Sequence, residues 1–369
     1  MTTNFSLPNF QEVLTSRFCK DHLSVVAEYT TAHCTEALFF DGRLYGIAAG
    51  TLRGYRGLFA KLPPLFSGTV LVPEALAPVS LPRRKTTLLS VQDGVAALAV
   101  QPVPAQKYPF AAVDGKKNPV YADYKEAETL SHRKRDGIFI LEESRLIQRA
   151  VNDNLDIKHI LYSNKSKLIQ DGTLKAAAER NIPCFPVSEG LLSSVTSTRP
   201  APAELAYCLL PGFGLKDISL YVDSTLLIAD NIENPDNLGL ILRTADACGA
   251  DAVLCIGSQA SIYHKNCVRA ARGALGRMPI LEYTPEELPA LAAELKSLGY
   301  SLCGSSAKAA ATVGNLEPHP RRAYIVSNET FGITEAMRAQ CDEMLRIPMA
   351  TGQSSLNVAV AAGILLSQA

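Results

Sequence analysis

The chain has 369 residues, of which 47% are hydrophobic, and its 36 Lys and Arg balance 36 Asp and Glu. This composition excludes a disordered or fibrous protein, and the zero net charge excludes a uniformly basic coat. The amino terminus lacks the pattern of a signal peptide, and the longest apolar run, 358–366, is far shorter than the ~20 residues that span a membrane. We therefore expect a cytoplasmic protein of two or three domains, with neither a membrane nor DNA as partner.

The nine cysteines are scattered along the chain without a CxxC pair. Metal ligands and disulfide frameworks use closely spaced or paired cysteines. The spacing therefore predicts reduced, mostly buried thiols and no metal site.

Residues 1–110 contain two hairpin signals, Asp41-Gly42 and Asp93-Gly94, each between apolar runs. An Asp-Gly pair in this position favours a tight primed turn. A Pro/Ala-rich stretch at 102–120 follows and is typical of a linker. We predict an α+β domain here, and no chemical motif indicates its role.

Residues 111–210 alternate between strand and helix patterns. Apolar runs predict strands at 137–141, 157–162 and 182–187, and helical periodicity predicts helices at 144–151 and 174–180. This pattern indicates a small layered α/β/α domain.

Residues 211–369 show a more regular alternation. Strands are predicted at 225–229, 252–256, 300–303, 323–326 and 344–347, with helices at 238–248, 264–275, 286–298, 333–340 and 355–367. Repeated strand–helix units predict a parallel sheet covered by helices on both faces.

A parallel sheet of this kind binds ligands beyond the carboxyl ends of its strands. The chain has neither a GxGxxG nor a GxxxxGK[ST] loop, so a dinucleotide or P-loop enzyme is disfavoured. Three polar segments follow the predicted strands instead: NPDNLGLILRTADACGAD, VSNETFGITEAMRAQCDEMLRIPM and SSLNVAVAAGILL. Taken singly, their Asn, Ser and Arg residues would be ordinary helix caps or solvated side chains.

In this order, the three segments resemble the three motifs of the TrmH-like (SpoU) family of the SPOUT methyltransferase superfamily. The resemblance covers about 223–369. Residues 121–208 resemble, more weakly, the ribosomal-protein-like substrate-binding domain that many of these enzymes carry, and 1–110 resemble no family. The implied architecture is a parallel-sheet α/β domain with a deep carboxy-terminal trefoil knot.

The resemblance implies transfer of a methyl group from S-adenosylmethionine to a ribose 2′-hydroxyl of RNA. Ribosomal RNA is favoured over transfer RNA by analogy with relatives that carry an auxiliary domain. The family is usually a homodimer, with the active site completed across the interface of the catalytic domains.

The resemblance also assigns catalytic roles to residues of the three motifs. Arg243 matches the family's catalytic arginine, which can fork onto an RNA phosphate, position the ribose and assist its deprotonation. The amides of Asn237 and Asn357 can orient the arginine, the ribose or the cofactor. Ser355 lies near a helix amino terminus, and Glu329 can hold the arginine or a hydroxyl.

The cofactor is expected on the backbone and apolar walls of the knot loops. The residues assigned to it are Gly304, Ser327, Asn328, Gly332, Ile347, Met349 and Leu356. At Ser327 this chain departs from the family, which commonly has Gly there, and this bears on cofactor affinity.

RNA contacts are predicted at two basic patches, Arg133-Lys134-Arg135 and the pair Arg269 and Arg272, which would share one helix face. Residues 1–120 hold 12 basic and 8 acidic residues, 121–210 hold 12 of each, and 211–369 hold 12 and 16. The net charges of +4, 0 and −4 predict a focused RNA footprint and RNA binding with a modest salt dependence.

The alternatives to an RNA methyltransferase are an RNA-binding protein that keeps the fold without catalysis, and a different nucleotide-binding α/β enzyme.

Overall fold

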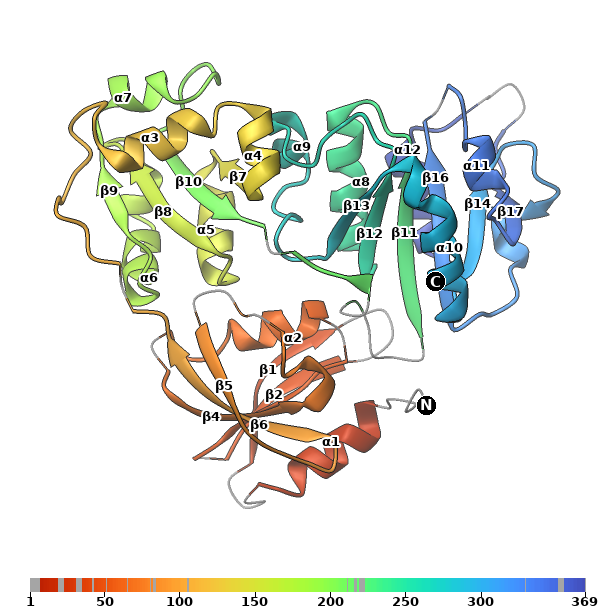
Figure 1. Cartoon of the computed structure of the whole chain (residues 1–369), viewed down its shortest axis with the longest axis horizontal. Helices are drawn as coiled ribbons and strands as arrows, with labels where there is room; N and C mark the ends of the chain where they lie inside the picture. Colours follow the sequence, from red (N-terminus) through yellow and green to blue (C-terminus); the bar gives the residue numbers. More distant parts are fainter. Residues whose placement is uncertain are drawn as a thin grey trace.

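A computed structural model of the chain describes three β-sheets with their helices, in three regions that follow one another in sequence (Figure 1). No helix in the described part of the chain is long and apolar enough to cross a membrane. The residues that the structure describes are 7–18, 23–30, 35–41, 43–50, 52–64, 66–79, 81, 84–104, 106–210, 212–215, 218, 223–328, 330–350 and 355–368.

The amino-terminal region is a six-stranded sheet in the order β1-β2-β3-β4-β6-β5. One apolar cluster joins the sheet to α2 and a second joins it to α1, so the two helices cover opposite faces. The elements are α1 (Leu7–Thr15), β1 (Ser24–Thr30), β2 (Thr35–Phe40), β3 (Tyr45–Ala48), α2 (Leu52–Phe59), β4 (Gly68–Pro73), β5 (Arg84–Gln92) and β6 (Val95–Pro102).

Both predicted hairpins of this region are confirmed. β2 pairs antiparallel with β3, and the Asp41 carboxylate accepts the N–H groups of Arg43 and Leu44 at 3.0 and 2.8 Å in the connecting turn. β5 pairs antiparallel with β6, and Asp93 and Gly94 between them have φ of 51° and 73°. Two consecutive left-handed residues are what a primed two-residue turn requires.

The middle region is a four-stranded sheet in the order β7-β10-β8-β9, with α5 and α6 on one face and α3 and α7 on the other. The strand β10 at its centre is absent from the sequence prediction. The elements are α3 (Pro119–Glu126), α4 (Leu130–Asp136), β7 (Ile138–Leu141), α5 (Ser144–Asn152), β8 (Ile157–Tyr162), α6 (Thr173–Glu179), β9 (Cys184–Pro186), α7 (Glu189–Ser194) and β10 (Glu204–Leu209).

The carboxy-terminal region is a parallel seven-stranded sheet in the order β13-β12-β11-β16-β14-β17-β15. Its five central strands match the predicted ones, while the short edge strands β13 and β15 were not predicted. The elements are β11 (Ser224–Asp230), α8 (Pro235–Ala247), β12 (Ala252–Ile256), α9 (Lys265–Ala270), β13 (Ile280–Tyr283), α10 (Leu288–Ser297), β14 (Ser301–Ser305), β15 (Ala311–Thr312), β16 (Arg321–Ser327), α11 (Glu335–Arg338), β17 (Glu343–Arg346) and α12 (Val358–Leu366).

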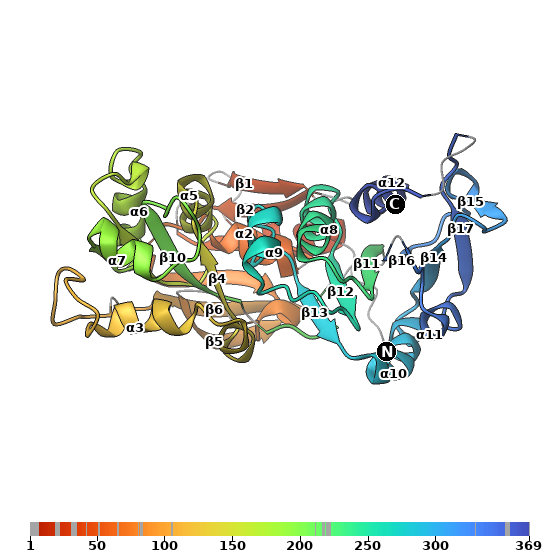
Figure 2. The ribbon, with the colours of Figure 1, turned by 90° about the horizontal axis from the view of Figure 1, so that it is seen from above.

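Helices cover both faces of this sheet, as its alternating pattern predicts. α8, α9 and α12 pack on one face, and α10 and α11 pack on the other (Figure 2). The apolar cluster under α8, α9 and α12 also contains Phe139, Ile147 and Ile157 of the middle region. A single apolar cluster therefore joins the middle and carboxy-terminal sheets.

The helices of this region begin or end one to five residues away from the predicted bounds, and two of these differences have a clear physical cause. α9 stops at Ala270 rather than continuing to 275, and Arg272 just beyond it has φ of 50°, which no right-handed helix permits. Thr284 and Glu287 form a capping box ahead of the predicted helix 286–298, but residues 285–287 form a 3₁₀ turn. The α-helix α10 starts only at Leu288, because Pro289 lacks the N–H that would bond back into that turn.

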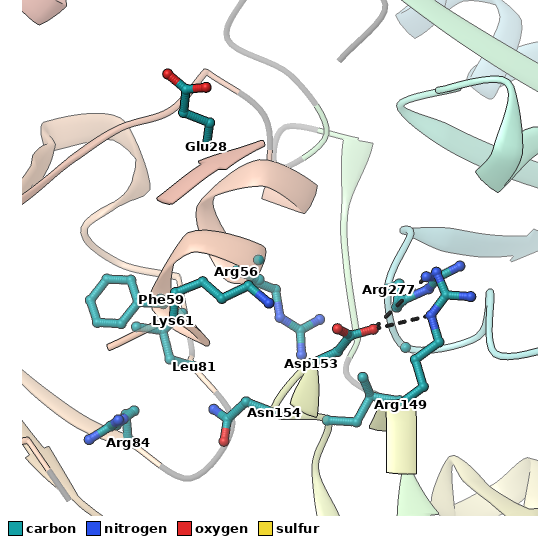
Figure 3. Close-up of a pocket in the computed structure, with 13 residues that line it drawn as sticks. Glu28, Arg56, Phe59, Lys61, Leu81, Arg84, Arg149, Asp153, Asn154 and Arg277 are labelled. Atoms are coloured by element: carbon teal, nitrogen blue, oxygen red, sulfur yellow. Dashed lines mark ion pairs between the residues drawn. The ribbon is translucent and has the colours of Figure 1, made fainter. Parts of the chain in front are cut away.

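A pocket of about 380 Å³ marks the junction of the three regions (Figure 3). Asp153, just beyond α5, lies 3.5 Å from Nε of Arg149 and 3.9 Å from Nη1 of Arg277, which also pairs with Asp246 of α8. Arg56 of α2 extends from the amino-terminal region toward this group. The amino-terminal region thus meets the other two through charged side chains rather than through a shared apolar core.

The close approach of α8 to α9 predicts a steric limit. A Cβ at Gly239 of α8 would lie 2.5 Å from the Cys267 carbonyl oxygen and 2.6 Å from the Ala270 Cβ of α9. We expect Gly239→Ala to push α9 away and to lower the free energy of unfolding by about 1–3 kcal/mol, measured by chemical denaturation. Gly190→Ala is the matched control, because no atom lies within 4 Å of a Cβ there. Equal stability of the two variants would contradict the close packing.

Candidate functional site

A pocket of about 340 Å³ lies at the carboxyl ends of β14 and β16, between the loops that lead to α11 and α12. This is where a parallel sheet is expected to bind its ligand. Six of the seven residues predicted for the cofactor line it: Ser327, Asn328, Gly332, Ile347, Met349 and Leu356. Ser355, predicted as catalytic, lines the same pocket.

Gly304 is the exception among the seven. It lies in β14 one residue before the pocket wall, and a Cβ there would meet Met344 Sδ at 2.6 Å and Cys341 Sγ at 2.8 Å. The glycine therefore makes room for the side chains under α11 rather than for a ligand. Its neighbour Ser305 lines the pocket, and its hydroxyl donates to the Ile325 carbonyl at 2.8 Å.

The loop after β16 forms one wall of the pocket through a compact turn. The N–H of Thr330 donates to the Asn328 side chain at 2.8 Å, and the N–H of Gly332 donates to the Asn328 carbonyl at 2.9 Å. Gly332 has φ of 70°, a left-handed conformation that glycine adopts without strain. The turn leaves Phe331 73% exposed. Glu329, predicted as catalytic, lies outside the described residues.

A buried carboxylate at the end of β11 anchors this loop. Asp230 accepts the N–H of Thr334 at 2.7 Å and its hydroxyl at 3.2 Å, and the Thr334 hydroxyl in turn caps α11. Burial raises the pKa of Asp230, and the two hydrogen bonds from Thr334 oppose that rise. Asp230 was not among the predicted site residues, because the sequence gives no sign of a partner 104 residues away.

The first and third motifs meet through their asparagines. Asn357 caps α12 by accepting the N–H of Ala359 at 3.0 Å, and its Nδ2 donates to Oδ1 of Asn237 at 3.1 Å. Asn237 lies in the first turn of α8, which Asn234 caps. The structure therefore brings Asn237, Asn357 and the pocket residue Ser355 together at one end of two packed helices.

Arg243 is not part of this cluster. It lies six residues, or about 9 Å, along α8 from Asn237, and its side chain is exposed. It does not line the pocket, and among the described residues it makes no hydrogen bond or ion pair. Within one chain the predicted catalytic arginine thus stays apart from the predicted cofactor residues.

The first predicted RNA patch divides into buried and exposed members. Arg133 is only 7% exposed, whereas Lys134 and Arg135 are exposed on α4. The guanidinium of Arg135 pairs with Asp136 at 2.7 Å. The three consecutive residues therefore do not present one continuous basic surface.

The second predicted patch does not form as expected. Arg269 is the last basic residue of α9 and lies 3.6 Å from Asp236, while Arg272 lies beyond the helix and pairs with Glu143 of the middle region. The expectation that both share one helix face is wrong, because the helix ends between them. Arg272 instead links the middle region to the carboxy-terminal region.

The pocket also contains residues that the sequence prediction missed. They lie at the end of β14, in the loop after it, in the turn leading to α11 and at the end of α11: Ser305, Ser306, Lys308, Thr330, Phe331 and Arg338. The loop after the third predicted strand could have indicated them, since it follows the same strand-end rule as the other loops.

Together, the parallel sheet and the loop-built pocket at its carboxyl edge define an α/β enzyme without a phosphate loop. The model of the SpoU rRNA Methylase family matches residues 224–367. The chain is 30% identical over 254 residues to the 23S rRNA (guanosine(2553)-2'-O)-methyltransferase RlmP of Bacillus subtilis strain 168, covering 69% of this chain and 97% of that protein. The chain therefore belongs to the SpoU rRNA methylase family.

Solved structures agree with this assignment. The SpoU methyltransferase AviRb from Streptomyces viridochromogenes, in complex with AdoMet, superposes with a TM-score of 0.60 at 26% identity, covering 68% of this chain and 96% of that one. A second structure, described as an RNA 2'-O ribose methyltransferase, superposes with a TM-score of 0.57 at 25% identity. The match covers 70% of this chain and 97% of that one. The predicted family, and with it the predicted class of RNA methyltransferase, is confirmed.

The Asp230 anchor predicts an effect on ligand affinity. In Asp230→Asn, a neutral amide oxygen replaces the carboxylate that accepts the Thr334 N–H, so the charge-assisted hydrogen bond weakens and the pocket loop loosens. We expect S-adenosylmethionine to bind about tenfold more weakly by isothermal titration calorimetry. Glu335→Gln is the control, because that side chain is 92% exposed on the same turn. Unchanged affinity in Asp230→Asn would show that the anchor does not shape the pocket.

Proposed function

We propose that the chain transfers the methyl group of S-adenosylmethionine to a ribose 2′-hydroxyl of ribosomal RNA. The observation that carries this proposal is the convergence of the second and third motifs on one pocket, with the first motif bonded to it through Asn237 and Asn357. The relative that this chain covers almost completely acts on 23S rRNA by its name, which favours ribosomal over transfer RNA. A ribosomal substrate also implies a cytoplasmic site of action.

The pocket suits the proposed cofactor in size and chemistry. A ligand of this size needs a largely apolar cavity of at least ~300 Å³ with a few polar groups. Ile333, Ile347 and Val358 supply apolar walls for adenine, while Asn328 and the loop backbone supply donors and acceptors. The bound cofactor supplies the electrophilic methyl group. Ser327 lines the pocket at a position where the family commonly has Gly, and its hydroxymethyl group is therefore proposed to affect cofactor affinity.

The chain's own residues would position the ribose. The Asn237–Asn357 pair keeps one amide hydrogen and one carbonyl in a fixed orientation beside the pocket, and Ser355 adds a hydroxyl. A weakly nucleophilic hydroxyl gains most from being held in line with its electrophile. Arg243 would hold the adjacent phosphate, and because a guanidinium stays protonated in proteins, an electrostatic role is favoured over that of a free base. Glu329 is proposed to orient the arginine or a ribose hydroxyl.

We propose that a second copy of the chain completes the site. Arg243 lies apart from the pocket of its own chain, on a surface that also exposes Leu240 of α8 and Val360 of α12, at 37% and 52%. The two helices pack closely there, since a Cβ at Gly363 would lie 3.3 Å from Thr244 Cγ2. A dimer built on this α8–α12 surface would bury the apolar side chains and bring Arg243 to the partner's pocket.

Each of the three regions has a proposed role. We propose a catalytic domain at 211–369 whose loops after β16 and β17 form the trefoil knot, since α12 returns from the β17 side to pack on β16 and α8. Residues 111–210 are proposed to bind RNA, and 1–110 to form a separate domain.

Arg243→Ala is expected to abolish methylation of ribosomal RNA, because the phosphate beside the target ribose would no longer be held. Its affinity for S-adenosylmethionine should stay within about twofold of wild type, because the side chain is exposed and apart from the pocket. Transfer of a tritiated methyl group measures the first and calorimetry measures the second.

Lys296→Ala serves as the control, because Lys296 lies on α10 on the opposite face of the sheet. Persistent methylation by Arg243→Ala would refute the assigned role. If the wild-type chain binds ribosomal RNA but not S-adenosylmethionine at millimolar concentration, the catalytically inactive RNA-binding alternative is correct.

Val360→Glu is expected to separate the proposed dimer, because it places a charge in the apolar α8–α12 surface. Sedimentation should give a monomer, methylation should be lost, and cofactor affinity should remain, since Val360 does not line the pocket. Val13→Glu, at a similarly exposed valine of the amino-terminal region, is the control. A Val360→Glu chain that sediments like wild type would place the interface elsewhere.

A further inference from the structure

A third pocket, of about 430 Å³, lies between the middle region and α9. Its walls come from α4, from the end of β7, from residues 195–198 and from α9, so both regions contribute to it. None of the three motifs reaches it, and the amino-terminal region takes no part in it.

A buried arginine without an acceptor faces this pocket. Arg133 is only 7% exposed, its Nε has no hydrogen-bond partner, and its guanidinium forms no ion pair within the described residues. Glu142 attracts it electrostatically, but the two Glu142 oxygens accept the hydroxyls of Thr196 and Thr198 at 2.7 and 2.6 Å. A guanidinium has five N–H donors, and burial without acceptors is costly. Arg133 is therefore suited to a ligand that supplies oxygen atoms.

The cations of α9 extend this positive charge to the mouth of the pocket. Lys265 donates only to the Ser197 hydroxyl, at 2.7 Å, and the side chain of Arg269 is 66% exposed. The pKa of His264, at the start of α9, is lowered by burial and then by the charges of Arg133 and Lys265. The local potential is thus positive although the chain as a whole is neutral.

The acidic residues of the pocket are already engaged by cations outside it. Glu128 pairs with Lys125, and Glu143 accepts from Arg272 at 2.7 Å. These pairs neutralise the carboxylates without using the cations that line the pocket. An anion entering the pocket therefore meets three basic groups and no unpaired acid other than Glu142.

Beside the cations the pocket has an apolar floor. It is formed by Ile140, Leu141, Leu146, Val195 and Val268. A phosphate alone would need no such surface, whereas a nucleotide has both a charged phosphate and a flat base that packs on apolar side chains. The volume also falls within the range of small-ligand pockets.

The pocket is connected to the proposed active site through α8. Asp236 accepts from Asn266 of α9 at 3.1 Å and lies 3.6 Å from Arg269, and the next residue, Asn237, bonds to Asn357. An RNA strand held in the pocket would thus lie along the α8–α9 contact toward the site of methylation.

We infer that this pocket binds one nucleotide of the substrate RNA, with a backbone phosphate on Arg133 and the base on the apolar floor. The inference rests on the proposed RNA substrate, and it selects Arg133, Lys265 and Arg269 from the basic residues of the two regions. Arg135 and Arg272, which do not line the pocket, are excluded.

The test compares Arg133→Met with Arg135→Met in the full chain, since each removes one charge from the same helix. We expect Arg133→Met to bind the organism's ribosomal RNA about tenfold more weakly, with a matching rise in KM, and Arg135→Met to change affinity by less than about twofold. The cofactor affinity and kcat at saturating RNA should stay constant in both. A folded Arg133→Met chain that binds ribosomal RNA as wild type does would overturn the inference.

Two further arms separate the alternatives. Lys265→Met changes an exposed residue, so this variant can be tested even if Arg133→Met fails to fold. It should weaken RNA binding a few-fold, and unchanged binding would overturn the inference. Titration with the four ribonucleoside 5′-monophosphates and with inorganic phosphate should favour at least one nucleotide, and equal binding of phosphate would overturn the assignment of a base. Loss of RNA affinity in Arg133→Met, in a chain that never methylates RNA, would support this pocket while refuting the proposed function.

Discussion

The close packing of α8 against its neighbours is the constraint on which the candidate cofactor pocket and the proposed RNA pocket depend. Gly239 lets the backbone of α9 approach within contact distance on one side, and Gly363 lets α12 approach on the other. Because these separations are fixed, Asn237 reaches Asn357 at the end of α12 while Asp236 reaches Asn266 and Arg269 of α9. Two adjacent residues of one helix thus contact the start of α12 beside the candidate cofactor pocket and the helix α9 that lines the proposed RNA pocket. A small shift of α8 would move both sites together.

The sequence was informative where a local pattern is sufficient. The five central strands are apolar runs bounded by turn residues, and the strand-end rule places the motif loops at one edge without any knowledge of contacts. It was uninformative where a partner decides the structure. The β10 segment Glu204–Leu209 has no β-branched residue and becomes a strand because β7 and β8 pair with both of its edges. Arg272, just beyond α9, adopts a left-handed conformation that no sequence pattern indicates either.

The candidate site likewise contains residues that the sequence predicts and residues that only tertiary contacts identify. Loop residues such as Ser327, Ile347 and Leu356 were predicted from the family resemblance and lie on one pocket. Gly304 follows the predicted strand 300–303 and was assigned to the cofactor with them, yet its missing Cβ makes room for Met344 and Cys341, which only the folded structure shows. Asp230 belongs to a strand end that looks ordinary in sequence. Its importance comes from a hydrogen bond to Thr334, across a separation that no local pattern spans.

The neutral charge of the whole chain results from side chains with separate functions. The positive excess of the first 120 residues lies in the region that meets the others at the Arg149–Asp153–Arg277 group. Arg277 binds Asp246, near the end of α8 that is about 14 Å from Asn237. The amino-terminal region therefore joins the opposite end of the helix from the cofactor pocket. Within one chain, its charges would therefore meet RNA away from the proposed site of methylation.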